Sequence, residues 1–161
     1  MIDTAGIAAL LHDIDRRSPA GFAIALHIRF TAPTYLFQTY PKRWLDYYSE
    51  HGLVLHDPTV RWALASSGHV LWSELEEIDT YGVLERARDF GLMNGVAISV
   101  VDATSRSIAS FARADRDFDP GEVAVLREDL WTLHRQTAVR TGDLNVTQQR
   151  ALTELSVRLT R

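Results

Sequence analysis

A pair of closely spaced apolar runs is the feature of this sequence that most constrains its fold. Residues 96–101 and 108–112 are apolar except for one serine in each, and the mostly polar segment 102–107 separates them. Such runs, joined by a short polar segment, predict a β-hairpin with a somewhat long turn. Upstream, residues 21–30 place an apolar side chain on every second position, which is typical of a strand with one buried face. The alternating residues are Phe22, Ile24, Leu26, Ile28 and Phe30. Residues 35–37 are a candidate for one more short strand.

Helical patterns surround these strands. Apolar residues recur at helical spacing in residues 3–17, and Pro41 and Pro58 occupy positions at which a proline opens a helix. We expect further helices over 83–90 and 120–140, and a last helical run near the C-terminus. The order of helix, strands, helices, hairpin and helices favours an antiparallel sheet flanked by helices over a doubly wound parallel sheet.

Size and charge exclude several classes of protein. A chain of 161 residues suits one compact domain. No apolar run approaches the roughly 20 residues of a membrane-spanning helix, and the first residues carry no secretory signal pattern. We therefore expect a cytoplasmic protein without a membrane partner. The formal net charge of −4 argues against DNA binding by this segment alone.

Signals of enzymatic or metal chemistry are weak throughout. The sequence has no cysteine, which removes disulfides, thiolate zinc sites and cysteine nucleophiles. Its six histidines show no HxH or HExxH spacing, and no Gly-rich phosphate loop is present. Ser66, Ser67 and Ser110 lack the GxSxG context of a nucleophile elbow. We expect neither a cofactor nor a metal site, and no catalytic residue.

Aromatic residues crowd the segment 40–72 around the one acidic residue that lies in an apolar setting, Asp57. Tyr40, Trp44 and Tyr48 are each four residues apart, so a helix that begins near Pro41 can align them along one stripe. Stripes of this kind occur in cores and in ligand pockets alike, because aromatic side chains dominate the energetics of both. The pattern by itself favours a core over a pocket.

The same segment resembles the autoinducer-binding domain of LuxR-type quorum-sensing regulators. Residues 40–48 carry the YPxxWxxxY pattern of that family, a DP pair begins at Asp57, and Trp72 follows. Residues 91–96 are similar to the family's GLxxG turn before its central hairpin. The resemblance covers roughly residues 3–140, and it changes the interpretation of the aromatic stripe from core to pocket. It implies an α-β-α sandwich, with an antiparallel sheet of about five strands and helices on both faces.

The resemblance also implies a ligand, an N-acyl homoserine lactone that the chain binds without converting it. Each polar atom of such a ligand needs a partner once water is excluded, since an orphan group costs about 1–3 kcal/mol. By similarity, Trp44 would donate its indole N–H to the lactone carbonyl and Asp57 would accept from the amide N–H. The acyl carbonyl would accept hydrogen bonds from the hydroxyls of Tyr40 and Ser110.

Apolar walls around the lactone ring and the first acyl carbons are implied as well. The main wall residues by similarity are Tyr48, Trp72 and Leu92, and the weaker candidates are Val60, Trp62 and Val83. Pro58 and Gly95 match positions that shape the backbone. Asp57 has a second interpretation as the N-cap of the helix that begins at Pro58, and a carboxylate with two oxygens can serve both purposes.

The domain assignment follows from the same resemblance. We expect an autoinducer-binding domain over residues 1–143 and a C-terminal helix or linker over 144–161, without the helix-turn-helix DNA-binding domain of the family. DNA would be reached only through a domain that is not in this chain. The principal hypothesis is a ligand-binding sensor domain whose folding or dimerisation is coupled to the signal. The alternative is a truncated relative that forms inactive heterodimers with a LuxR-type regulator.

The helix expected over 120–140 occupies the place where regulators of this family dimerise. Leu126, Leu130, Trp131 and Leu133 are candidates for a dimer seam. Packing of the same side chains against the sheet is an equally good interpretation of the pattern. A homodimer or a heterodimer is therefore the expected assembly, and its geometry stays open.

Overall fold

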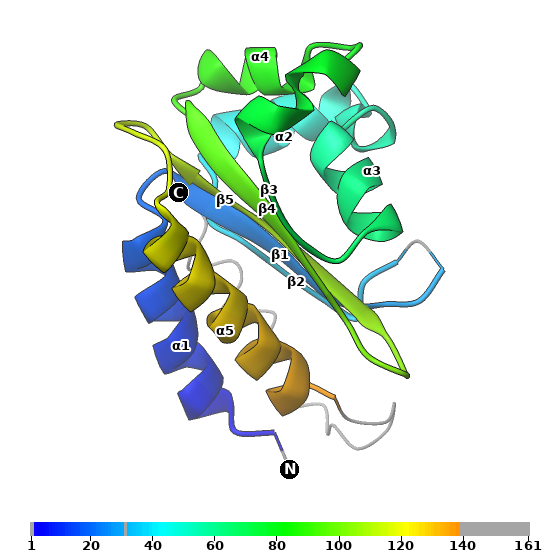
Figure 1. Cartoon of the computed structure of the whole chain (residues 1–161), viewed down its shortest axis with the longest axis vertical. Helices are drawn as coiled ribbons and strands as arrows, with labels where there is room; N and C mark the ends of the chain where they lie inside the picture. The colour runs from blue at the N-terminus through cyan, green and yellow to red at the C-terminus, as the bar shows by residue number, and fades with distance from the viewer. Residues whose placement is uncertain (1, 31, 139–161) are drawn as a thin grey trace.

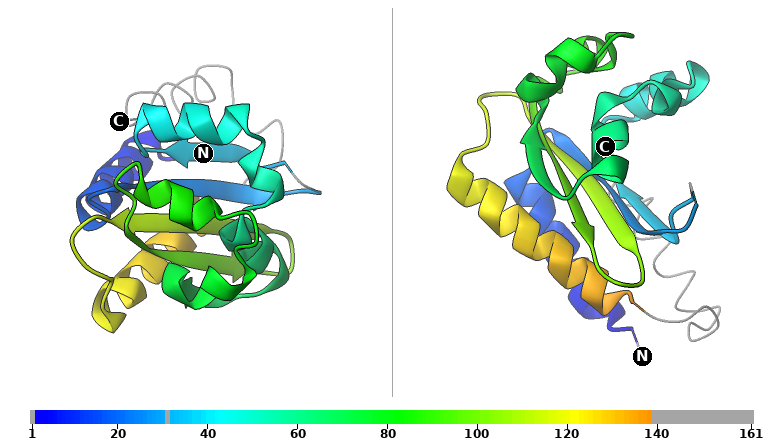
Figure 2. Two further views of the ribbon diagram at one scale, coloured as in Figure 1. Left: turned by 90° about the horizontal axis from the view of Figure 1, so that it is seen from above. Right: turned by 45° about the vertical axis from the view of Figure 1, so that its right-hand side comes forward.

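Three layers make up the structure, a computed structural model that describes residues 2–30 and 32–138. A five-stranded antiparallel sheet is the middle layer, in an α+β fold as predicted (Figure 1). Figure 2 shows α1 and α5 on one face of the sheet and the remaining helices on the other. The elements are α1 Thr4–Arg17, β1 Gly21–Ile28, β2 Tyr35–Gln38, α2 Lys42–Glu50, η1 Leu53–Leu55, α3 Pro58–Ala65, β3 Gly68–Leu71, η2 Trp72–Ile78, α4 Val83–Arg88, β4 Asn94–Val101, β5 Arg106–Arg113 and α5 Pro120–Gln136. The segment predicted over 144–161 lies outside the described residues.

The strands lie in the order β2-β1-β5-β4-β3. The predicted hairpin is confirmed as β4 and β5, which pair from Asn94 opposite Arg113 to Val101 opposite Arg106. β5 also pairs with β1, where Ala23 lies opposite Ser110. Because cross-strand partners project to the same side of a sheet, this register decides which side chains face each helical layer.

The alternation predicted for residues 21–30 holds only as far as Leu26. The pairing of β1 with β5 shifts between Ala25 and Ile28, and His27 in that bulge has a φ of 54°. One extra residue in a strand reverses the direction of the side chains that follow it. Ile28 therefore faces the side opposite to Leu26, and Phe30 lies beyond the strand, 101% exposed. The prediction that Phe30 belongs to the buried face of this strand is wrong.

Large side chains fill the layer between the sheet and α1 with α5. Leu126, Leu130 and Leu133 of α5 are each 0% exposed and belong to one core cluster with the inward side chains of β1, β4 and β5. Trp131 is partly buried against the same cluster. The interpretation in which the leucines pack on the sheet is therefore confirmed, and they are not free to form a dimer seam.

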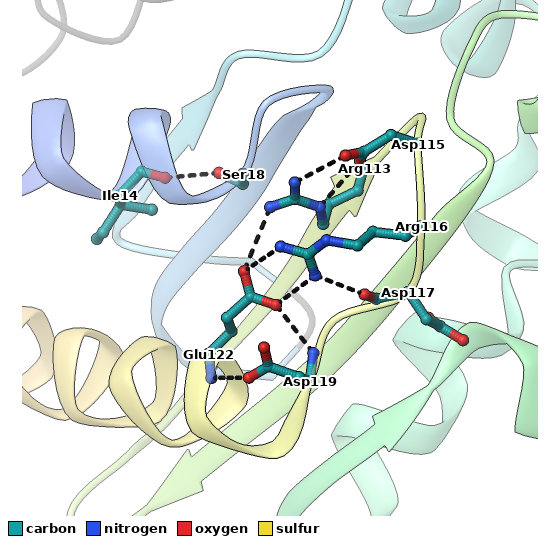
Figure 3. Close-up of polar contacts among 8 residues, drawn as sticks. All are labelled: Ile14, Ser18, Arg113, Asp115, Arg116, Asp117, Asp119 and Glu122. Atoms are coloured by element: carbon teal, nitrogen blue, oxygen red, sulfur yellow. Dashed lines mark hydrogen bonds and ion pairs between the residues drawn. The ribbon is translucent and has the colours of Figure 1, made fainter.

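The connection from β5 to α5 is held by a charged network (Figure 3). Arg113 at the end of β5 pairs with Asp115, and Arg116 pairs with Glu122. Asp119 and Glu122 form a capping box at the start of α5, in which each side chain accepts from the backbone N–H of the other residue. The beginning of α5 is thus fixed to the end of β5, the central strand of the sheet.

The other end of α5 is joined to the sheet by a buried polar cluster. The rings of His27 and His134 stack with centroids 4.4 Å apart. His134 is hydrogen-bonded through Nδ1 to the Ser107 hydroxyl at 2.6 Å and through Nε2 to the Asp102 carboxylate at 2.8 Å. His27 Nε2 lies 2.9 Å from the Thr137 hydroxyl. The bulge in β1 thus gives α5 a polar anchor near its last turn.

The helical layer on the opposite face is made of short elements. Asp57 caps the N-terminus of α3, and Pro58 is its first residue, as the sequence predicts. The helix ends at Ala65, and β3 begins three residues later at Gly68. In the described segments, no helix has the length and apolar character required to cross a bilayer.

Candidate ligand-binding site

A cavity of about 530 Å³ lies between the sheet and the short helices. Strands β1, β2 and β5 line one side of it, and residues of α2, η1, α3, η2 and α4 line the other. Its volume falls in the range of about 300–1,000 Å³ that is usual for small-molecule sites. The space between the sheet and the short helices is therefore large enough to hold a small molecule.

Most of the side chains singled out in the sequence meet in this cavity, although they come from seven different elements or connections. The lining includes Tyr40, Trp44, Tyr48, Asp57, Val60, Trp72, Val83 and Ser110. Leu92, expected as a wall residue, does not line the cavity; it is 1% exposed and belongs to the hydrophobic cluster that contains Trp44 and Trp72. Trp62 is partly buried against that same cluster and does not line the cavity.

Asp57 is the acidic group of the cavity, and its carboxylate is held in place by neighbours on both sides. Oδ1 accepts from the backbone N–H of Thr59 at 2.9 Å and from the Thr59 hydroxyl at 2.6 Å. Oδ2 accepts from the Tyr48 hydroxyl at 2.7 Å. The N-cap interpretation is therefore confirmed. The backbone N–H of Val60 also donates toward this carboxylate, so both of its oxygens are engaged by groups of α3 and by Tyr48.

Two more polar side chains converge on Ser110 in β5. Trp72 donates its indole N–H to the Ser110 hydroxyl oxygen at 2.8 Å. Tyr40 donates its hydroxyl to the Ser110 backbone carbonyl at 3.0 Å. The ring of Trp72 lies directly over Gly95, where an added Cβ would come within 2.1 Å of it. Gly95 is thus required by the close approach of this ring.

Helix α2 supplies the aromatic wall at this end of the cavity. Trp44 is 4% exposed, and its ring packs edge-on against Tyr48 with centroids 5.6 Å apart. Phe90, just after α4, contacts the Trp44 ring at 5.3 Å. Since aromatic pairs in such arrangements add to the free energy of burial, the orientation of Trp44 is fixed by its neighbours as well as by its helix.

The electrostatics of the site follow from burial. Removal from water raises the pKa of Asp57 above its ordinary value, and the hydrogen bonds from Thr59 and Tyr48 act in the opposite direction. Burial also raises the pKa of Tyr40 and of Tyr48, the latter further because Asp57 lies beside it. Both phenols therefore keep their protons at neutral pH and act as donors. The site combines neutral donors with one carboxylate acceptor.

Sequence analysis missed the other half of the cavity, which is apolar. β1 contributes Ala23, Ala25 and Ile28, β2 contributes Leu36, and α3 contributes Leu64. Alanines in a strand give no motif to recognise. The available signal was that residues 23 and 25 are small while their neighbours 22, 24 and 26 are large.

A second hollow of about 350 Å³ lies on the other side of Trp72 and is lined by several acidic residues with Arg88. It shares Trp72 and Leu84 with the larger cavity. Among the residues that the structure describes, no group of three or more His, Asp or Glu side chains is arranged to hold a metal ion. The polar side chains predicted as ligand contacts lie in the larger cavity.

Comparison with known proteins agrees with this geometry. Residues 22–138 match the family model of the autoinducer binding domain. The quorum-sensing regulator RhlR of Pseudomonas aeruginosa is 29% identical over 130 residues, which cover 78% of this chain and 54% of RhlR. Matches to curated relatives cover between 27% and 54% of their lengths, so the chain spans at most about half of those proteins.

Solved structures share the fold. Crystalline SdiA of Escherichia coli superposes with a TM-score of 0.58 at 21% identity and covers 96% of this chain and 63% of SdiA. The N-acylhomoserine lactone dependent LuxR family factor CepR2 of Burkholderia cenocepacia gives a TM-score of 0.53 at 18% identity, over 83% of this chain and 92% of that one. With its family match, its layered fold and a cavity between sheet and helices, the chain belongs to the autoinducer-binding domains of LuxR-type quorum-sensing regulators.

Proposed function

We propose that this chain is a sensor domain that binds an N-acyl homoserine lactone in the cavity between sheet and helices and does not convert it. The observation that carries the proposal is the convergence of Tyr40, Asp57 and Ser110 at one end of an otherwise apolar cavity. A buried carboxylate and neutral donors suit a neutral ligand that has both carbonyl groups and an N–H.

The acceptor in this proposal is Asp57, whose carboxylate takes a further hydrogen bond from the ligand amide. Tyr48 and Thr59 already hold the carboxylate, so it is oriented before the ligand arrives. A pre-oriented acceptor loses little conformational entropy on binding. Trp44 donates its indole N–H to the lactone carbonyl from the aromatic wall.

The acyl carbonyl finds its donors at Ser110. Because the Ser110 hydroxyl oxygen accepts from Trp72, its own proton is free to be donated to the ligand. The Tyr40 hydroxyl donates to the Ser110 backbone carbonyl, and binding requires it to turn toward the ligand. Tyr48, Trp72, Val60 and Val83 enclose the ring and the first acyl carbons, and Leu92 supports them from behind.

Ligand binding is coupled to folding or to dimerisation in this proposal. A ligand between the layers contacts the sheet and the helices at once, and that arrangement exists only in the folded chain. A ligand that binds only the folded state stabilises it by about 2.7 kcal/mol at a free concentration of about 100 times Kd. The autoinducer therefore acts as part of the core.

The first experiment is thermal unfolding of the purified 161-residue chain with and without a panel of N-acyl homoserine lactones. We expect Tm to rise by a few degrees with the matching lactone, since that gain in free energy is large for a domain of this size. Intact lactone should be recovered after incubation. A folded protein whose Tm no lactone changes would contradict the proposal.

Substitution of Asp57 tests the carboxylate directly. Asn also caps helices well, so Asp57→Asn keeps the start of α3 while it removes the charge. Hydrogen bonds to charged groups contribute about 1.5–3 kcal/mol, and we expect Asp57→Asn to weaken lactone binding by about 10- to 100-fold. Trp62→Phe, outside the lining, should change it little. Equal Kd values for both variants in calorimetric titration would remove Asp57 from the site.

The alternative function, heterodimerisation with a full-length LuxR-type regulator, makes a different prediction. In that case the chain co-purifies with the regulator without lactone, and neither Tyr40→Phe nor Asp57→Asn changes the yield of the complex. Dependence of the complex on lactone would instead support the sensor function.

A further inference from the structure

The cavity changes from polar to apolar along the direction of β1. Gln38, Ala23 and Ser110 lie side by side across β2, β1 and β5, in the row where Tyr40 and Trp72 make their hydrogen bonds. In the next row toward the bulge, Leu36 and Ile108 flank Ala25. Polar side chains are thus replaced by apolar ones within two residues along each strand.

Helix α3 follows the same direction above the sheet. Its N-cap is Asp57, which accepts a hydrogen bond from the Tyr48 hydroxyl at the polar end. Near its other end the Ala63 carbonyl accepts from the Ser99 hydroxyl at 2.8 Å and from Arg106 at 2.9 Å. Since Ser99 pairs with Ile108 and Arg106 with Ile28, that end of the helix lies over the apolar rows. Figure 1 shows α3 descending toward the connection between β1 and β2.

The residues of β1 that line the cavity below α3 form its floor, and their small side chains leave open space between the strand and the helix. Ala23 and Ala25 line the cavity. Phe22, Ile24 and Leu26, which alternate with them along the strand, point to the opposite face and are each 0% exposed. The lining reaches solvent at Leu36 and Leu64, which are 43% and 40% exposed. The result is an apolar channel that starts at the polar groups and opens at the surface.

The length of this channel fits a long alkyl chain. On the regular strand β5, the partners of Ala23 and Ile28 are Ser110 and Arg106, which are four residues apart, roughly 13 Å at about 3.3 Å per residue. An extended alkyl chain advances about 1.3 Å per carbon, given bonds of about 1.5 Å at tetrahedral angles. The channel therefore accommodates about ten carbons before it reaches the opening.

We propose that the ligand of this chain carries a long, unbranched acyl group of about ten carbons or more, which extends from Ser110 over Ala25 to the opening between Leu36 and Leu64. The inference rests on the proposed function, and it adds the chain-length class of the ligand and the residue that sets it. Ala25 is that residue, because any larger side chain between Leu36 and Ile108 narrows the channel.

The test is calorimetric titration of the 161-residue chain with butanoyl-, hexanoyl-, octanoyl-, decanoyl- and dodecanoyl-homoserine lactone. Each buried methylene adds to affinity, so we expect the dodecanoyl compound to bind at least about tenfold more tightly than the hexanoyl compound. A series in which hexanoyl binds as tightly as dodecanoyl, or more tightly, overturns the long-chain proposal and leaves the proposed function standing. If no lactone binds a folded chain, the proposed function fails first.

Two variants locate the acyl group. Ala25→Leu should weaken dodecanoyl binding by about tenfold or more and hexanoyl binding by less than about threefold, because only the longer chain passes this position. Leu64→Ser, at the exposed opening and outside the core, should reduce dodecanoyl binding selectively even if Ala25→Leu folds poorly. Ala9→Leu, an exposed alanine on α1, is the matched control and should leave the series unchanged. Equal losses for both lactones in Ala25→Leu and in Leu64→Ser would contradict the assigned path.

Discussion

The two faces of the sheet are built from the same strands and have opposite character. Toward α1 and α5, β1 directs Phe22, Ile24 and Leu26, all fully buried in a filled core. Toward the short helices, the same strand directs Ala23 and Ala25 into a cavity. The comparison shows that strand alternation here sorts side chains by size as well as by polarity. Stability resides mainly on one face, and the space for a ligand lies on the other.

The sharpest test of this division is a pair of neighbouring residues in β5. Phe111 is 0% exposed and lies opposite Phe22 in the filled layer, so Phe111→Ala should lower the free energy of unfolding by about 3–5 kcal/mol. Ser110→Ala, one residue earlier, faces the cavity and should lower it by only about 1 kcal/mol. Urea unfolding measures both. Similar losses for the two variants would show that the faces do not differ in this way.

A smaller effect is expected where the cavity wall meets the sheet. The ring of Trp72 occupies the space that a Cβ at Gly95 would need. Gly95→Ala must displace that ring, which we expect to lower the free energy of unfolding by about 1–3 kcal/mol and to weaken lactone binding through loss of the bond to Ser110. Gly91→Ala is a useful contrast, since a Cβ there meets no atom within 4 Å but its φ of 88° is strained. Gly91→Ala should lower the free energy of unfolding and leave lactone affinity unchanged.

The smallest effect concerns pH and the polar anchor on the filled face. Burial, and then the neighbouring ring of His134, lower the pKa of His27 below 6.5, and Arg29 lowers it further. The hydrogen bond to the His134 backbone carbonyl and the charge of Asp102 act in the opposite direction. The unfolded chain therefore binds a proton at His27 that the folded chain excludes. The contribution of His27 to the free energy of unfolding is fully present above pH 6.5. It is lost as the pH falls toward the folded-state pKa, by less than about 1.4 kcal/mol per pH unit.

His27→Asn checks this assignment, because Asn tolerates the left-handed backbone of the bulge and does not titrate. The variant should be less stable at neutral pH and should show a flatter dependence of unfolding free energy between pH 5 and pH 6.5. An unchanged slope would assign the acid sensitivity to other groups.

Most of the fold could be predicted from periodicity and from helix signals. The hairpin of β4 and β5, the helix from Thr4 and the proline starts of α2 and α3 all depend on short-range patterns. The bulge at His27 could not be predicted, because it depends on Ser107, Thr137 and the end of α5, which are remote in sequence. Phe30 was wrongly predicted to lie on the buried face because the bulge was not predicted.

The site divides in the same way. Its polar end was accessible because Tyr40, Trp44 and Asp57 belong to a spaced motif. The capping of α3 by Asp57 was accessible from the proline that follows it. The apolar end depends on which face of β1 each alanine occupies, and a tertiary register is needed to decide that. The roles of these residues toward a ligand stay predictions until binding is measured.

The extra residue at His27 sets the length of the apolar floor of the cavity. Without it, Ile28 would point toward α5, His27 would point toward the short helices, and the row of apolar floor residues would end at Ala25. The reach of the floor is therefore decided by a backbone insertion as much as by side-chain size. Two related domains with identical floor residues can therefore differ in the length of the ligand that they accommodate, if one of them lacks the insertion.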